Sequence, residues 1–323
     1  MSDGPNIDTV RALGQQLSNW GRWGPEDGKG TLNLIRPEHI THAASLVRSG
    51  KVISMAVPFD EDGPQTGGLG RFNPIHLMIR DGADAIAGTS IRDFYGGVDK
   101  HFRGTDDIII MPLQSGTQWD ALGHVVFGDI IWNGYSADQV SSKGAMKGAI
   151  TEAAEGMVGR GVLLDVAAAL GVEWLEPGFA IGADELDRAA AFGNVTVGEG
   201  DYVFVRTGAM AKVKADGAWG DYAGGDAPGL GLKSAEWVHS RNIVAVATDT
   251  WGLEVRPNET ADVAQPMHII FIAHMGLWLG EIFDFEALAK DCADDGVYEF
   301  MFAGPPLPFT RAVGSPLNPL AIK

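Results

Sequence analysis

The sequence predicts an α/β protein with a mixed sheet, and three features support this class. Short apolar runs typical of buried strands alternate along the chain with helical patterns. No Pro/Ser-rich linker and no internal repeat with a period of about 20 to 50 residues interrupts them, so residues 1–323 are expected to form a single domain. A chain of 323 residues is also long enough to bury a sizeable core.

The first predicted elements lie before residue 72. Residues 37–49 are expected to form a helix, because proline occupies the first turn, apolar residues follow at helical spacing and Gly50 ends the pattern. Residues 51–58 are expected to form a strand. The glycine-rich segment 60–71 is predicted to be a long loop over the surface or over a pocket.

The next strand carries the polar residues of most interest. Residues 107–113 form an isoleucine-rich run that predicts a buried strand, and the alternation continues through Gln118 and Asp120 towards a catalytic edge. Further strands are expected at 161–166, 202–206 and 243–248, separated by helices at 183–192, 234–241 and 285–290. The proline-rich tail, residues 305–319, is expected to be an extended segment that packs on the body or on a neighbouring subunit.

Charge and cysteine content exclude several classes of protein. The chain has 24 Lys and Arg against 42 Asp and Glu, a formal net charge of −18, so it should repel nucleic acid and anionic membrane surfaces. Residues 1–10 contain no apolar signal region, and no uncharged apolar run is long enough to span a bilayer. Cys292 is the only cysteine, which excludes an intrachain disulfide and a thiolate metal cluster. These features predict a cytoplasmic protein without nucleic-acid or membrane partners.

The segment from Gln114 to His124 concentrates polar chemistry directly after the apolar strand. In an extended chain Gln114, Gln118 and Asp120 would project from one face, and Gly116 would leave room between them. Two amide oxygens and a carboxylate are able to hold a divalent cation, with His124 close enough in sequence to act as a base on a bound water. The alternative is structural, because Gln and Asp at strand ends also cap helices or bind backbone groups.

The same segment resembles the H-x-G-T-H-x-D-x-P-x-H signature of the cyclase family, which includes bacterial kynurenine formamidase and isatin hydrolase. Similarity continues well beyond the motif and covers nearly the whole chain. The segments that carry it are Arg22-Trp-Gly-Pro, Gly30-Thr-Leu-Asn-Leu, Gly161-Val-Leu-Leu-Asp, Gly200-Asp-Tyr-Val-Phe-Val-Arg-Thr-Gly and Gly314-Ser-Pro-Leu-Asn-Pro-Leu-Ala-Ile. The resemblance implies a compact α/β domain whose mixed sheet is partly closed as a barrel, with flanking helices and extended terminal arms.

The resemblance also implies a set of metal ligands. The family's two metal-binding histidines fall on Gln114 and Gln118, its aspartate on Asp120 and the motif's last histidine on His124. A further histidine and glutamate of the family match two later residues, His268 and Glu281, with a spacing one residue longer than in the formamidases. His274 competes with His268 for the ligand role, although a core histidine with a backbone partner is the better interpretation of His274.

The two replacements change the expected metal. Imidazole suits zinc, whereas a carboxamide offers only a weakly coordinating neutral oxygen. The remaining ligands are oxygen-rich, so one divalent cation is expected, with manganese favoured over zinc or magnesium and without a second, Gln114-supported metal. Complete loss of the metal is the alternative, and it would leave a catalytically inactive small-molecule-binding protein.

The function that follows is metal-dependent hydrolysis of an amide, lactam or lactone bond in a small cyclic or N-acyl substrate. Metal charge would activate the attacking water, while His124 shuttles a proton to the leaving atom. Trp23 and Trp119 are candidates for an aromatic pocket, and Arg71 and Arg206 for binding a substrate carboxylate, although Arg206 could equally form a buried structural pair. The family resemblance further implies a homodimer or homotetramer.

Overall fold

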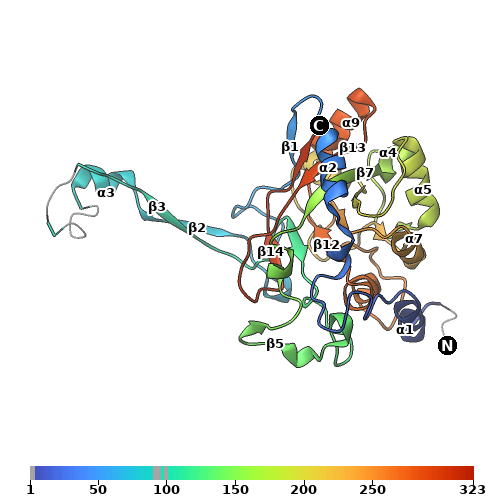
Figure 1. The fold of residues 1–323 in the computed structure, drawn as a ribbon. Helices are drawn as coiled ribbons and strands as arrows, with labels where there is room; N and C mark the ends of the chain where they lie inside the picture. The colour runs from blue at the N-terminus through green and yellow to red at the C-terminus, as the bar shows by residue number, and fades with distance from the viewer. Residues whose placement is uncertain (1–3, 90–95, 98–100) are drawn as a thin grey trace.

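The computed structural model describes residues 4–89, 96–97 and 101–323. Its centre is a mixed sheet of nine strands, which is drawn in Figure 1. From one edge to the other, the order is β1 (Val52–Ser54), β15 (Leu320–Ile322), β13 (Glu299–Ala303), β7 (Val158–Asp165), β9 (Tyr202–Arg206), β11 (Ala245–Thr248), β12 (Trp278–Glu281), β4 (Gln118–Asp120) and β14 (Gly314–Pro316).

The four central strands are parallel and the flanking strands are antiparallel. Strands β7, β9, β11 and β12 form the parallel part, whereas β13, β15, β1, β4 and β14 join by antiparallel pairing. Residues 202–206 and 245–248 are buried along their whole length. This agrees with their continuous apolar sequences, because parallel strands are covered on both faces.

Helices follow the parallel strands and cover the sheet. The helix after β7 begins at the strand's last residue, where the Asp165 side chain accepts a hydrogen bond from the Ala168 N–H at 2.9 Å. The helices are α1 (Ile7–Gln16), α2 (Pro37–Ser45), α3 (Gly82–Ala87), α4 (Val166–Leu170), α5 (Ala183–Phe192), α6 (Ala209–Asp216), α7 (Ala235–Ser240), α8 (Pro266–His268), a π-helix over Ile269–Met275 and α9 (Glu286–Asp295).

The sheet curls into a half barrel. The chain that leaves β1 crosses to the end of β12, where Ala56 bridges Phe283 and Met55 accepts a hydrogen bond from the Asp284 N–H at 2.9 Å. Packed aromatic rings fill the interior, with Phe204 and Phe302 4.9 Å apart between their centroids. The predicted α/β class with a mixed, partly barrel-like sheet is therefore confirmed.

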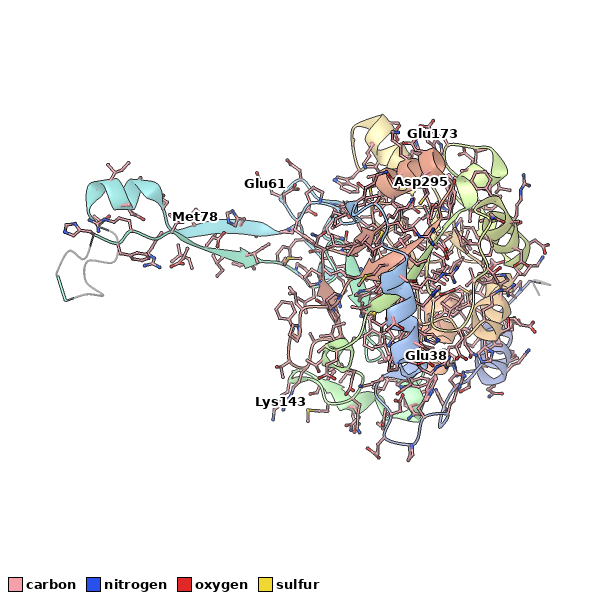
Figure 2. The ribbon with its side chains drawn as sticks, turned by 45° about the horizontal axis from the view of Figure 1, so that its top comes forward. Glu38, Glu61, Met78, Lys143, Glu173 and Asp295 are labelled. Atoms are coloured by element: carbon pink, nitrogen blue, oxygen red, sulfur yellow. The ribbon has the colours of Figure 1, made fainter. Side chains whose placement is uncertain are left out.

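A two-stranded arm projects from this body. Figures 1 and 2 show β2 (Ile75–Arg80) and β3 (Asp106–Ile110) extending away from the sheet, with Met78 far from the rest of the molecule. Residues 107–110 are exposed, so the prediction of a buried strand over 107–113 is wrong. These isoleucines lie on the surface of the arm instead of in the core. The sequence shows that the segment is apolar but does not show whether other residues pack against it.

Most other predicted elements are present, with different ends. The helix predicted over 37–49 ends at Ser45, and the strand predicted over 51–58 shortens to β1. The helix predicted over 285–290 extends to Asp295. The proline-rich tail is extended and packs on the body, where β14 and β15 join the sheet. No helix in the described part of the chain is long and apolar enough to cross a membrane.

Candidate metal centre

The polar residues after the predicted strand 107–113 lie where the sheet changes from parallel to antiparallel. Strand β4 pairs antiparallel with β12, and Gln118 lies opposite Glu281, the last residue of β12. Because side chains alternate along a strand, Gln118 and Asp120 point to one face and Trp119 points to the other. In sheets with a parallel core, such edges outside the carboxyl ends of the strands commonly hold ligands.

Three side chains of metal-binding type meet on this face. Asp120, His268 and Glu281 are all buried, and one potential ligand atom from each lies within 4.8 Å of the others. Glu281 Oε1 lies 3.0 Å from His268 Nε2 and accepts a hydrogen bond from the Leu253 N–H at 3.1 Å. Gln118 Nε2 donates to Glu281 Oε2 at 2.9 Å. The sequence-predicted ligand set is therefore a single contiguous cluster.

Three buried oxygen atoms of the cluster have no hydrogen-bond partner among the described residues. They are both carboxylate oxygens of Asp120 and Oε1 of Gln118, the amide oxygen that remains once Nε2 has donated to Glu281. A buried carboxylate without partners is costly, because it has left water without gaining hydrogen bonds or an opposite charge. A divalent cation coordinated by these oxygens would remove that cost. The donor set therefore fits a bound metal.

Burial and mutual charge shift the pKa values of the cluster. Burial raises the pKa of Asp120, and the nearby Glu281 adds to the increase, while His124 opposes it. Burial also acts against the charged form of His268, but the carboxylates of Glu254 and Glu281 outweigh it and raise its pKa well above the usual value. For Glu281 the hydrogen bond from His268 and its charge outweigh burial and lower the pKa. These directions favour the charged form of Glu281 and the protonated form of His268.

Glu254 holds His268 in place, and the sequence analysis did not identify it. Its Oε2 accepts a hydrogen bond from the Met267 N–H at 2.8 Å, and its Oε1 is hydrogen-bonded to Nδ1 of His268. Pro266 begins the short helix that carries His268, so the Glu254 carboxylate also satisfies the free N–H groups at the start of that helix. Its only sequence signal is an acidic residue within a loop after β11, which is too common to single out.

His124 lies at the border of the cluster. Its backbone N–H donates to Ala121 O at 2.9 Å, which forms a turn directly after β4. The turn leaves Nε2 3.8 Å from Asp120 Oδ1 and the side chain 21% exposed, whereas Asp120 is fully buried. His124 is therefore the residue of the predicted set that both solvent and the cluster reach.

Arg71 adds a positive charge on the same side. Its guanidinium lies over the Trp251 ring, 5.3 Å from the centroid. Its charge opposes the increase in the pKa of Asp120 and contributes to the decrease in the pKa of Glu281. Trp251 donates its indole N–H to Gln65 Oε1 at 3.2 Å, and Gln65 Nε2 donates to Ser115 O at 3.0 Å. The glycine-rich loop that holds Gln65 and Arg71 is thus fastened beside the cluster.

The two predicted aromatic residues lie elsewhere. Trp119 is fully buried on the opposite face of β4, where it donates to Gly304 O at 2.8 Å and packs edge-on against Phe283 and Phe302. The prediction that it contacts substrate is therefore corrected: Trp119 is a core residue, because strand alternation turns it away from Gln118 and Asp120. Trp23 packs near Trp132, with 6.3 Å between ring centroids, and among the described residues no ring contact or hydrogen bond joins it to the cluster.

Two further residues, His274 and Gln114, were candidates for binding the metal. The His274 ring stacks on Trp20 with centroids 5.3 Å apart and lies against Gly14 of α1, away from the cluster. His274 is thus a buried stacking residue, although its Nε2 lacks the expected partner among the described residues. The Gln114 side chain lies against Gly314 of β14, the residue that pairs with Asp120 across the two strands. The structure therefore brings His268, rather than His274, together with Gln118, Asp120 and Glu281.

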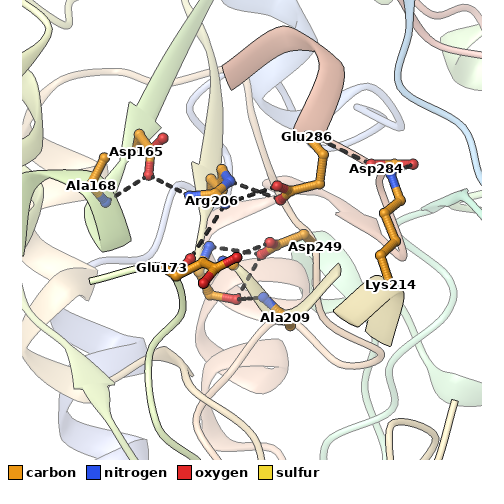
Figure 3. Close-up of polar contacts among 11 residues, drawn as sticks. Asp165, Ala168, Glu173, Arg206, Ala209, Lys214, Asp249, Asp284 and Glu286 are labelled. Atoms are coloured by element: carbon orange, nitrogen blue, oxygen red, sulfur yellow. Dashed lines mark hydrogen bonds and ion pairs between the residues drawn. The ribbon is translucent and has the colours of Figure 1, made fainter. Parts of the chain in front are cut away.

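Arg206 forms the buried structural pair that the sequence left open. Figure 3 shows its guanidinium between Asp165, at 3.0 Å, and the carboxylate of Glu286, at 2.8 and 2.9 Å. Burial opposes the charged guanidinium, but these carboxylates outweigh it and raise the pKa of Arg206. With both flanking carboxylates engaged, Arg206 ties the carboxyl ends of β7 and β9 to α9.

Comparison with known proteins places this architecture. A model of the Cyclase family matches residues 41–255. A solved structure described as a novel cyclase is 36% identical, with a TM-score of 0.85, and covers 96% of this chain and 99% of its own. No curated protein matches the sequence.

Two isatin hydrolases share the fold at lower identity. Isatin hydrolase A from Ralstonia solanacearum is 16% identical with a TM-score of 0.61, over 99% of this chain and 98% of its own. Isatin hydrolase A from Labrenzia aggregata, bound to benzyl benzoate, is 19% identical with a TM-score of 0.57, over 86% of this chain and 94% of its own. The family match spans more than half of the sequence, and the similarity to the solved cyclase structure covers nearly all of it, so the chain belongs to the cyclase family.

Proposed function

We propose that the protein is a metal-dependent hydrolase that opens an amide, lactam or lactone bond of a small cyclic or N-acyl substrate. The observation that carries the proposal is a group of three buried oxygens, from Asp120 and Gln118, that have no hydrogen-bond partner in the described part of the chain and lie beside His268 and Glu281. Purely structural roles would leave Asp120 as a buried carboxylate without compensation. Membership of a family that contains metal-dependent hydrolases supports the same conclusion.

Gln118, Asp120, His268 and Glu281 would hold one divalent cation. Amide and carboxylate oxygens outnumber the single imidazole, which favours manganese over zinc, with magnesium as a further candidate. When bound, such a cation supplies a positive charge that polarises a carbonyl and promotes ionisation of water. Glu281 and Asp120 supply the balancing negative charge, and Glu254 fixes the ring of His268.

His124 is proposed to move the proton. As water adds to the carbonyl carbon, His124 Nε2 takes one of the water protons, and it returns that proton to the leaving nitrogen or oxygen as the C–N or C–O bond breaks. The products are a carboxylic acid and an amine or alcohol group, joined in one molecule when the substrate is cyclic. The position of His124 supports this role. Its Nε2 lies 3.8 Å from Asp120 Oδ1 and its ring is partly exposed, so the ring reaches both the cluster and incoming water.

Arg71 is proposed to bind the substrate. Its guanidinium is anchored over Trp251 next to the cluster, where it is able to donate to a carboxylate or to the carbonyl oxygen. The anchoring ring limits its motion, so the donor is held in place before substrate arrives.

One observation favours a second candidate, a metal-free binding protein. The His268 ring lies between two carboxylates, with Nδ1 on Glu254 and Nε2 on Glu281, so a doubly protonated imidazole satisfies both without a cation. In that arrangement the cluster would be an internal ion-pair network in a protein that binds a small molecule without cleaving it. Asp120 and Gln118 Oε1 gain nothing from it, which is the reason to prefer the hydrolase.

Metal content and hydrolysis separate the two candidates. Protein purified without a histidine tag is analysed by mass spectrometry, and the hydrolase predicts close to one divalent cation per chain. The same preparation, with manganese, is assayed on N-formyl anilines, isatin and aromatic lactones. Less than about one tenth of a metal equivalent after incubation with manganese, together with no hydrolysis, would support the binding protein instead.

We further propose a cytoplasmic homo-oligomer, either a dimer or a tetramer. A lone buried Cys292 fits a reducing compartment. The arm supports assembly, since one of its faces is entirely aliphatic: Ile75, Leu77, Ile79, Ile108 and Ile110 are between 44% and 61% exposed. An isolated two-stranded hairpin is marginally stable in water, and a second copy of the chain would cover this face.

A further inference from the structure

A cavity of about 730 Å³ lies at the carboxyl ends of β9 and β11, and the chemistry proposed above does not use it. Its walls come from α6, from the segment 218–228 and from Thr250 and Trp251. The described residues that line it include none of the four proposed metal ligands. The size of the cavity is typical of small-molecule sites, so it could hold a second ligand that is distinct from the reacting molecule.

Three aromatic rings line this cavity. Trp219 and Tyr222 lie 5.2 Å apart between ring centroids, and Trp251 is the third. Each ring already donates its polar hydrogen to another part of the chain. The acceptors of Trp219, Tyr222 and Trp251 are, in that order, Asp62 O at 2.6 Å, Asp249 O at 3.0 Å and Gln65 Oε1 at 3.2 Å. The rings therefore offer a ligand their carbon surface and the negative potential of their faces.

The charged side chains of the wall are mostly acidic. One lysine and three aspartates line the cavity, and the Lys212 ammonium is already paired with Asp216 at 2.8 Å. The other two carboxylates, Asp221 and Asp226, take part in no ion pair within the described part of the chain. The hydroxyl of Thr250 donates to Gly252 O at 3.1 Å, so it is also engaged. The wall therefore attracts a cation and repels an anion.

Hydrogen bonds from the sheet edge hold the wall in place. The Asp249 carboxylate accepts from the N–H and hydroxyl of Thr207, at 2.8 and 2.7 Å, and from the Gly208 N–H at 2.9 Å, which fixes the turn that starts α6 (Figure 3). The Tyr222 hydroxyl binds the backbone oxygen of the same aspartate, so the segment 218–228 is fastened to that turn. A wall that is ordered in advance lowers the entropic cost of binding a ligand.

We infer that this cavity is a separate site for a small free molecule that carries a trimethylammonium group and no anionic group. Aromatic rings attract such a cation through their faces, and a quaternary nitrogen has no N–H that would need an acceptor. Its methyl groups would pack against the apolar part of the wall, which includes Leu175 and Val213. A phosphate or carboxylate on the ligand would meet the unpaired Asp221 and Asp226. The inference does not depend on whether the metal centre is a hydrolase.

Choline and 3,3-dimethyl-1-butanol test the requirement for a positive charge, because they have the same shape and differ only in a nitrogen or a carbon at the branch. Both are titrated into the full-length protein by calorimetry, with phosphocholine as a third probe. Choline should bind tighter than the alcohol by about tenfold or more, and tighter than phosphocholine by a similar factor. Equal binding of choline and the alcohol, tighter binding of phosphocholine, or no binding of choline at about 10 mM would overturn the inference.

Two matched substitutions test the location. Trp219→Leu keeps an apolar contact but removes the ring, so choline should bind about tenfold or more weaker while the alcohol binds nearly as before. Trp174→Leu is the control, because Trp174 is also half-buried, lies near Lys212 and is not part of the lining. It should bind choline like the wild type. Unchanged choline binding in Trp219→Leu, or equal losses in both variants, would refute the location. An equal loss of choline and the alcohol in Trp219→Leu would overturn the role of the ring face.

The two unpaired carboxylates are tested by a double substitution, Asp221→Asn with Asp226→Asn. Both side chains are exposed, so the fold should tolerate the change, and the melting temperature checks this. Choline binding should weaken by about threefold or more, because the attraction of the wall for a cation is reduced. Binding of the neutral alcohol should stay as in the wild type, which makes it an internal control for the shape of the cavity. Unchanged choline affinity in the double variant would overturn the selection of the ligand by charge.

Discussion

The carboxylate of Glu254 is hydrogen-bonded to Nδ1 of His268, and this contact decides which nitrogen of the ring faces the cluster. A carboxylate only accepts, so Nδ1 carries a proton, and Nε2 is the nitrogen 3.0 Å from Glu281. Glu254 also accepts from the Met267 N–H at 2.8 Å, which holds the carboxylate against the start of the helix. A carboxylate behind a histidine in this way orients a metal-binding ring and raises its basicity.

Glu254→Gln should therefore weaken manganese binding by about 10- to 100-fold while the protein stays folded. The amide keeps the size of the side chain but loses the charge that supports the ring. Titration of metal-free protein with manganese, followed by calorimetry, gives the affinity directly. Glu286→Gln serves as the control, since Glu286 is another partly buried carboxylate at the same sheet edge that pairs with Arg206 instead. Equal manganese affinities in the two variants would count against the positioning role.

Asp120→Asn should abolish metal retention. Both oxygens of this buried carboxylate lack a partner among the described residues, so the side chain contributes charge that only a cation or a proton neutralises. An amide in its place offers one weak oxygen donor and removes the electrostatic cost of burial. The melting temperature of the variant should consequently rise or hold in metal-free buffer, whereas manganese should no longer increase it. Full metal occupancy in Asp120→Asn would place the metal elsewhere.

Manganese should support a higher kcat than zinc at matched occupancy, because in the proposed site Gln118 would contribute an amide oxygen where an imidazole would favour zinc. Gln118→His reverses that choice and should tighten zinc binding by about tenfold or more. Competition between the protein and a zinc-specific dye measures this change, independently of activity. Zinc affinity that does not change in Gln118→His would mean that residue 118 is outside the coordination shell.

The sequence predicts the parallel part of the sheet well, because strands that are buried on both faces are apolar at successive positions. Tyr202–Arg206 appears as a continuous apolar run and is a strand with those bounds. The isoleucines of 107–110 form a similar apolar run, but they lie on an exposed arm. A local pattern shows that a segment is apolar. Only the tertiary structure shows whether that segment packs in the core of the same chain.

For the candidate site, too, the sequence predicts some residues and not others. Gln118, Asp120 and His124 lie within seven residues and follow a recognisable motif, so local spacing was enough to connect them. Trp119 was misplaced although strand alternation already separates it from both neighbours. Glu254 was missed because its contact with His268 depends on how a loop after β11 meets a helix 14 residues later, which no periodic pattern encodes.

Leu77→Asp should reduce the mass of the assembly in solution. Leu77 lies directly opposite Ile108 on the aliphatic face of the arm, and a charge there would oppose burial against a second chain. His76→Asp is the matched control, because His76 is exposed on the other face of the same strand, where it is 2.9 Å from Asp107. Light scattering after size exclusion should show dissociation in Leu77→Asp alone. Identical masses for both variants and the wild type would remove the arm from the interface.

The role of His124 is the most demanding test of the proposed chemistry, because three roles are compatible with its position. The ring lies 3.8 Å from Asp120 and partly reaches solvent, as a proton carrier requires. The same position would suit a weak ligand, or a residue that only stabilises the turn closed by the hydrogen bond from the His124 N–H to Ala121 O at 2.9 Å. Each role predicts a different combination of metal content, turnover and stability.

As a proton carrier, His124 is replaceable without loss of the metal. His124→Ala should keep the wild-type metal content and melting temperature while kcat falls by about 10²- to 10⁴-fold, the usual contribution of a positioned acid and base. His124→Gln retains a hydrogen-bonding side chain of similar length, and it should be equally slow if proton transfer is what is lost. Metal loss in both variants would make His124 a ligand. A lower melting temperature with normal turnover would assign it to the turn, because a residue that only supports the backbone leaves the reaction of the folded protein unchanged.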